Sequence, residues 1–87
     1  MAELKWRLVG TIIHYYTKLS VAIIELTDTL LLGDRISIEG YTTDLMQTVD
    51  SMQIEHKNVE KAVKGDFIGV RVEGRCRKGD KVKQSVT

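Results

Sequence analysis

A histidine, two tyrosines and a lysine stand close together near the start of the chain and could bind a nucleic acid. His14, Tyr15 and Tyr16 are consecutive, and Lys18 follows two residues later. On the wall of a β-barrel, aromatic rings can stack on unpaired bases while a lysine neutralises phosphate. The alternative is that Tyr15 and Tyr16, on opposite faces of a strand, divide between core and surface. His14, Tyr16 and Lys18 are therefore candidate RNA-binding residues.

Basic residues gather in the last third of a chain whose net charge is only +1. Residues 1–56 hold four Lys or Arg against eight Asp or Glu (−4), whereas residues 57–83 hold nine against four (+5). A cationic surface of this kind can contact RNA phosphates. The alternative is a lysine-rich surface that keeps strand edges soluble. The candidate phosphate contacts are Arg71, Arg75, Arg77, Lys78, Lys81 and Lys83.

The remaining reactive side chains do not form a catalytic pattern. His14 and His56 are far apart in the sequence and lack Cys or carboxylate partners at metal-ligand spacing. We find no Ser/His/Asp arrangement, no paired carboxylates and no glycine-rich phosphate loop. Cys76 stands between Arg75 and Arg77, whose charges would lower the pKa of an exposed thiol, whereas a buried thiol would be inert. The sequence therefore predicts a protein that is not an enzyme, without a catalytic residue, metal site, cofactor or nucleotide.

Three Gly-Asp pairs indicate the elements that must position these side chains. Gly33-Asp34, Gly65-Asp66 and Gly79-Asp80 each stand just before a run of β-branched or aromatic residues. Glycine tolerates the positive φ of tight turns, and alternating apolar residues are typical of strands. Three strand entries in a chain of 87 residues favour a small closed β-barrel.

The hydrophobic pattern places strands along most of the chain, at residues 9–16, 20–26, 35–39, 45–55, 66–73 and 80–86. The run 20–26 is apolar on both faces, which predicts cover on each side. In the run 45–55 the step from Val49 to Met52 requires a β-bulge near Asp50, or else an amphipathic helix; the threonines favour the strand. Residues 58–63 are expected to form one helical turn that begins at Asn58.

Composition indicates one small domain, 1–87, with 43% hydrophobic and 29% charged residues. No apolar run is long enough to span a bilayer, and the first residues lack the layout of a signal peptide. The single cysteine allows no internal disulfide. We therefore expect a cytoplasmic protein without a membrane partner.

Several segments of the chain resemble the second domain of elongation factor Tu and related translation factors. They are the strand entry Leu32–Ile38 and the runs Gln47–His56, Val59–Gly74 and Arg77–Val82, and the resemblance covers roughly residues 8–86. The resemblance, which extends to translation elongation factor-like proteins, implies an all-β, closed Greek-key barrel of about six or seven strands with one short helical turn. It also implies an inward-facing, inert Cys76. The pattern is also similar to the barrel that ends certain collagenase-like peptidase-family enzymes.

The leading hypothesis is a non-catalytic binding module that contacts RNA or a ribonucleoprotein, such as tRNA, rRNA or the ribosome, through its basic surface. One alternative is a protein–protein adaptor that docks onto a separate GTPase or enzyme chain. Another is an accessory domain of an RNA-modifying or peptidase-like enzyme.

Overall fold

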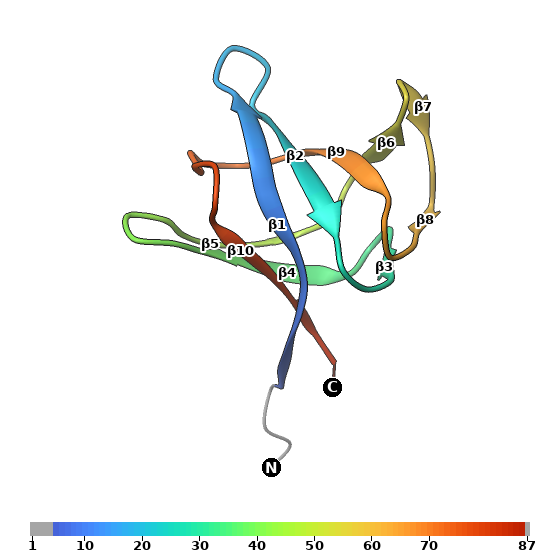
Figure 1. Ribbon diagram of the computed structural model, residues 1–87, viewed down its shortest axis with the longest axis horizontal. Coiled ribbons are helices and arrows are strands. Elements are labelled where there is room, and N and C mark those ends of the chain that lie inside the picture. The colour runs from blue at the N-terminus through green and yellow to red at the C-terminus, as the bar shows by residue number, and fades with distance from the viewer. Residues whose placement is uncertain (1–4, 87) are drawn as a thin grey trace.

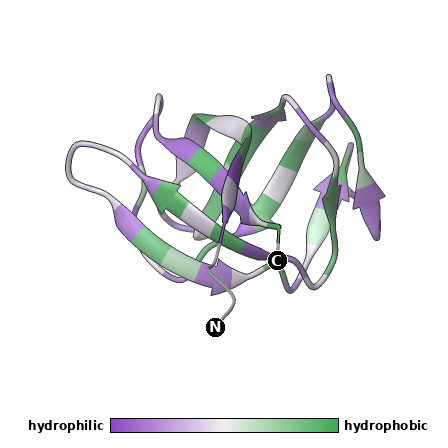
Figure 2. Cartoon of the chain, turned by 90° about the horizontal axis from the view of Figure 1, so that it is seen from below, coloured by the Kyte–Doolittle hydropathy of each residue, from purple (hydrophilic) through white to green (hydrophobic). Residues whose placement is uncertain are grey.

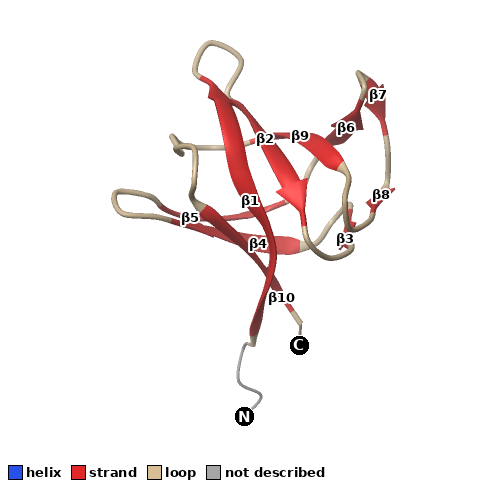
Figure 3. Cartoon of the chain, in the orientation of Figure 1, coloured by secondary structure: helices blue, strands red, loops and turns tan. Residues whose placement is uncertain are grey.

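The computed structural model describes residues 5–86, which form strands, turns and loops (Figures 1 and 3). The prediction of an all-β protein is confirmed. The first and last residues of the predicted domain, 1 and 87, lie outside this range. So do residues 1–4, on which the expectation about a signal peptide rested. The strands are β1 Trp6–Tyr16, β2 Val21–Leu26, β3 Leu30–Leu31, β4 Arg35–Glu39, β5 Asp44–Thr48, β6 Met52–Ile54, β7 Lys57–Asn58, β8 Lys61–Ala62, β9 Phe67–Arg71 and β10 Lys81–Ser85.

The predicted helical turn at residues 58–63 is wrong, because this segment forms strand pairs. Asn58 of β7 pairs with Gln53 of β6, and Ala62 of β8 pairs with Leu30 of β3. Between them, the amide of Val59 donates to the carbonyl of Met52. Pairing with β6, its neighbour in the sequence, and with the more distant β3 satisfies the backbone groups that a single helical turn would leave largely unpaired.

The predicted closed barrel is also wrong, because backbone pairing leaves the main sheet open. Its eight strands run in the order β5–β4–β10–β1–β2–β9–β6–β7, and β3 and β8 form a separate pair. Every adjacent pair is antiparallel. The sheet curves so strongly that β5 passes behind the strands of its other half in Figure 1.

The predicted strand 45–55 divides into β5 and β6, which pair at opposite ends of the sheet. β5 pairs with β4, whereas β6 pairs with β9 and β7. The expected bulge near Asp50 is therefore a break at which the chain crosses from one end of the sheet to the other. Val49 and Met52 are both buried at about 1% exposure. Burying both residues needs the break, since a continuous strand would place them on opposite faces.

Inward-facing residues of all the longer strands make one core. Ile36, Ile38, Ile68 and Val70 are fully buried, as their alternation predicts. Figure 2 shows the same alternation as green and purple bands along the ribbon. The other buried apolar residues are Val9, Ile12, Ala22, Ile24, Leu26, Leu30, Val49, Met52, Ala62, Val72, Cys76 and Val82.

The three Gly-Asp pairs form one repeated turn. Gly33, Gly65 and Gly79 have φ of 92°, 93° and 95°, the value required at the third position of a type II turn. In each turn the aspartate amide donates to the carbonyl three residues earlier at 3.0 Å, and the aspartate carboxylate accepts that residue's amide at 2.8–2.9 Å. The aspartates are therefore structural, as the turn pattern predicts.

Each of these turns also holds a buried residue from another part of the chain. The Gly79 amide donates to the carbonyl of Ile12, and the Ile12 amide donates to the carbonyl of Asp80, at 2.7 and 2.8 Å. The other two turns hold Leu26 and Val49 in the same way. The repeated motif therefore joins segments that are distant in sequence.

Candidate functional site

An outward surface of β1, β2 and β9, which we call the β1–β2–β9 face, carries part of the predicted cluster. Side chains of paired residues in antiparallel strands share a face. Tyr16 pairs with Val21 and Val21 with Arg71, which makes one row across the three strands. His14, Ile23 and Gly69 make the next row. Thr11, Glu25 and Phe67 make a third row. The face consists of Thr11, His14, Tyr16, Val21, Ile23, Glu25, Phe67, Gly69 and Arg71.

The two rings at the β1 side of this face contact each other. The centroids of His14 and Tyr16 lie 4.3 Å apart with an interplanar angle of 67°, an edge-to-face arrangement. Tyr16 is 46% exposed, whereas Tyr15 points inward and packs against the core. The tyrosines therefore divide between surface and core, which was the alternative interpretation.

The candidate RNA-binding residues are spread over three regions. His14 and Tyr16 lie on β1, with Lys18 in the turn that follows, and Arg71 lies across the sheet on β9. The third region is the connection from β9 to β10 together with β10, which carries Arg75, Arg77, Lys78, Lys81 and Lys83. Nothing in the comparisons tests their contact with RNA, which stays a prediction.

Two contacts modify this basic surface. The Gly79–Asp80 turn is hydrogen-bonded to Ile12, so the preceding basic loop ends beside β1. The Lys83 Nζ lies 2.8 Å from the Glu39 Oε2, and this contact lowers the pKa of the Glu39 carboxyl. Lys83 is thus paired with a carboxylate.

The Cys76 thiol is buried and faces the core. Its exposed fraction is 3%, and burial, with a smaller effect of the nearby Asp80 charge, raises its pKa to about 11. The expectation of a buried, inward-facing Cys76 is therefore confirmed, and its low reactivity stays a prediction.

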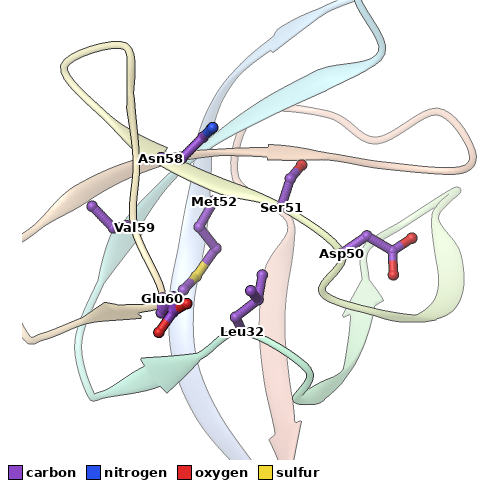
Figure 4. A pocket seen from close by; sticks show the side chains of 7 residues that line it. All are labelled: Leu32, Asp50, Ser51, Met52, Asn58, Val59 and Glu60. Carbon is purple, nitrogen blue, oxygen red and sulfur yellow. The ribbon is translucent and has the colours of Figure 1, made fainter.

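Two hollows lie on either side of the break between β5 and β6. One, of about 310 Å³, is lined by Leu32, Asp50, Ser51, Met52, Asn58, Val59 and Glu60 (Figure 4). The other, of about 580 Å³, is lined by Ser20, Gln47, Asp50, Ser51, Arg71, Val72 and Glu73. Asp50 and Ser51 border both hollows, so the crossing segment forms the ridge between them.

A third hollow, of about 460 Å³, is lined by residues 14–19 at the tip of the β1–β2 hairpin. It adjoins the β1–β2–β9 face, since His14 and Tyr16 belong to both. The sequence analysis did not single out Val21, Ile23, Phe67 or Gly69 of this face. The available signal was the run 20–26, which is apolar on both faces and predicts cover on each side.

Within residues 5–86, no three His, Cys, Asp or Glu side chains lie together as a group that could hold a metal ion. The same part of the chain has no helix that could cross a membrane.

The chain is similar to proteins named as proteases. No family model matches it. It is 47% identical over 75 residues to an uncharacterized protease of Methanocaldococcus jannaschii. The matched segment covers 85% of this chain and 18% of that protein. It is 40% identical over 76 residues to a collagenase of Porphyromonas gingivalis, covering 85% of this chain and 21% of that protein. The chain thus spans about a fifth of the length of the curated relatives it matches.

The fold is similar to the crystal structure of the C-terminal domain of a putative U32 peptidase from Geobacillus thermoleovorans. The TM-score is 0.84 at 12% identity, with 88% of this chain and 90% of that one covered. The selenomethionine variant of that domain gives the same score, with 98% of its chain covered. At this identity the likeness concerns the fold alone.

These relatives correct three predictions. The prediction of a translation elongation factor-like protein is wrong, because the matched proteins are proteases and a collagenase. For the same reason, the predictions of a protein that is not an enzyme and of a translation-related binding module are wrong. The alternative of an accessory domain that docks onto an enzyme agrees better with the comparisons.

Proposed function

We propose that this chain is an accessory domain of a U32-type peptidase and supports that enzyme's activity by packing on its catalytic part. The observation that carries the proposal is the 47% identity over 75 residues to a protease of which those residues are 18%. The match covers nearly this whole chain and a small part of the relative. This is the relation expected between a domain and the larger enzyme that contains it.

The likeness of the fold to a peptidase C-terminal domain supports the same proposal. That domain is the subject of a structure by itself, and the two chains match over about nine-tenths of each. Function follows from sites and not from fold. The fold therefore supports the proposal that this chain is a domain of a larger protein. The sequence identity supports the proposal that the larger protein is a peptidase.

The structure suits a rigid module. Within residues 5–86, every fully buried side-chain nitrogen or oxygen has a hydrogen-bond partner. A domain with a satisfied, packed interior offers its surface without reorganising, which lowers the entropic cost of packing on a partner. The domain would thereby hold the catalytic part in its active arrangement.

The proposal is tested with a chimera of the P. gingivalis collagenase in which this chain replaces the 76 matched residues. A second variant carries a Gly/Ser linker of the same length. We expect the chimera to keep hydrolysis of collagen and the linker variant to lose at least about tenfold, because small misplacements of catalytic groups are costly. A linker variant as active as the parent, or a folded chimera as inactive as the linker variant, would overturn the proposal.

A further inference from the structure

The β1–β2–β9 face is unusually apolar for the outer side of an antiparallel sheet. Such sheets commonly bury one face and present polar residues to water on the other. Here the outward positions of β2 hold Val21 and Ile23, both half-buried, before Glu25 ends the series. Phe67 on β9 is 54% exposed and Tyr16 on β1 is 46% exposed. β2 thus carries β-branched residues on both faces, and within residues 5–86 only its inner face is fully buried.

β1 and β2 lie in front of the other strands in Figure 1, and no described strand is drawn over them. The face continues into the hollow at the hairpin tip, where Leu19 is 66% exposed. A continuous apolar surface of this kind marks a site of interaction with another protein surface.

Gly69 lies in the middle row of the face, on β9, between Ile23 of β2 and Gln53 of β6. A Cβ built on Gly69 would lie 3.5 Å from the Val21 Cγ1 and 3.6 Å from the Ile23 Cδ1, which are ordinary contacts. Gly69 also lacks the positive φ of the three turn glycines. The fold therefore has room for a side chain here. A glycine inside a strand often marks a close approach by another backbone or a ligand.

We propose that the β1–β2–β9 face packs against the catalytic part of the peptidase, with Gly69 at the closest approach. This inference rests on the proposed function. The length of the relatives indicates what covers this face. In them, the matched segment is joined to about four-fifths of a longer protein, and that larger part is a permanent neighbour of the segment. Lys18 and Arg71 lie at the hairpin end of the face, and Glu25, which pairs with Phe67, lies at the other end. These charges fit a partner surface with an apolar centre, carboxylates opposite Lys18 and Arg71, and a cation opposite Glu25.

The first test places a charge in the middle row of the face without disturbing the domain. In the collagenase chimera, Gly69→Glu is expected to lower collagen hydrolysis at least about tenfold, because it puts a carboxylate into an apolar contact. The matched control is Thr48→Glu, on an exposed outward position of β5, which should equal the parent chimera. Both variants of the isolated chain should melt as the parent does.

The second test measures directly whether the catalytic part of the peptidase covers the β1–β2–β9 face. Ile23→Cys in the isolated chain should react readily with a thiol reagent, because position 23 is only half-buried. Cys76 is buried and should contribute little labelling. In the chimera we expect labelling at position 23 to slow at least about tenfold, whereas Thr48→Cys labels equally in both. Mass spectrometry of the labelled peptides gives the rates.

Equal labelling at position 23 in both proteins, or full activity of Gly69→Glu, overturns the assignment of this face. Concentration-dependent protection of position 23 in the isolated chain would identify a second copy as the occupant and also contradict it. An inactive parent chimera would instead contradict the proposed function, so the two failures are distinguishable.

Discussion

The side-chain amide of Gln47 binds the backbone around Arg71, across the gap at which the main sheet is open. The Gln47 Nε2 donates to the Arg71 carbonyl at 2.8 Å, and its Oε1 accepts the Glu73 amide at 2.8 Å. These are the two backbone groups that a neighbouring parallel strand would use. Next to this contact, a Cβ on Gly74 would lie 2.6 Å from the Leu45 side chain. Side chains of β5 therefore span the gap that backbone pairing leaves.

We expect Gln47→Ala to destabilise the chain by about 1–3 kcal/mol, because it removes the partners of a carbonyl and an amide at a site where Gln47 itself is only 5% exposed. Gln47→Glu keeps the acceptor for the Glu73 amide but, when ionised, sets a carboxylate oxygen against the Arg71 carbonyl, so it should destabilise the chain at least as much as Gln47→Ala near pH 7. Urea unfolding measures both variants. A loss below about 0.5 kcal/mol for Gln47→Ala would mean that water replaces the amide and that the gap is not held by this residue.

Gly40→Ala should destabilise the chain by about 1–3 kcal/mol. A Cβ at this position would lie 1.9 Å from the Asp80 Oδ1 and would displace a buried carboxylate that accepts the Arg77 amide at 2.8 Å. Thermal melting provides the measurement. Gly69→Ala is the matched control, since its Cβ has room, and it should be neutral or slightly stabilising. Equal melting temperatures for the two variants would contradict this account.

Gly65→Ala should cost about 1–2 kcal/mol through backbone strain alone, because the residue has a φ of 93° and no atom within 4 Å of the added Cβ. Gly65→Asn should recover part of this loss, since asparagine tolerates positive φ better than alanine. Urea unfolding of the three proteins distinguishes strain from steric conflict. If Asn and Ala are equally destabilising, strain is not the cause.

The Cys76 thiol should react about 100-fold more slowly with thiol reagents at pH 8 in the folded chain than in urea, since its pKa is raised from 9.0 to about 11. The folded state holds the proton more tightly, so this contribution to stability is fully present below pH 9 and is lost as the pH rises towards 11. Cys76→Ala should remove that part of the alkaline loss. Rapid labelling of the folded chain at pH 8 would contradict the burial of this thiol.

Local rules were sufficient for the turns and for most of the core. The Gly-Asp pairs specify type II turns because only glycine accepts the required φ easily and the aspartate reaches an amide three residues back. Alternation correctly placed Ile36, Ile38, Ile68 and Val70 inside. The division of Tyr15 and Tyr16 between core and surface also follows from a period of two.

Local rules failed where two distant segments compete for the same backbone groups. Residues 58–63 suit a helical turn locally, yet pairing of Ala62 with Leu30 and of Asn58 with Gln53 satisfies more backbone groups. The break after Val49 depends likewise on which strands are free to pair with β5 and β6. The exposure of the β1–β2–β9 face could not be predicted from local rules, because it depends on whether another element covers the outer side of these strands.

The Gly-Asp turns and the alternating core were therefore determined by the sequence itself, because each depends on residue type and on neighbours along the chain. The burial of Cys76 depends instead on the tertiary structure, since its neighbours along the chain are cationic. The tertiary structure alone decided that the sheet stays open, that Gln47 spans its gap, and that Val21, Ile23 and Gly69 lie together on an uncovered face. The physical reason is that strand pairing is a choice among partners distant in sequence, made by the total of buried area and satisfied hydrogen bonds.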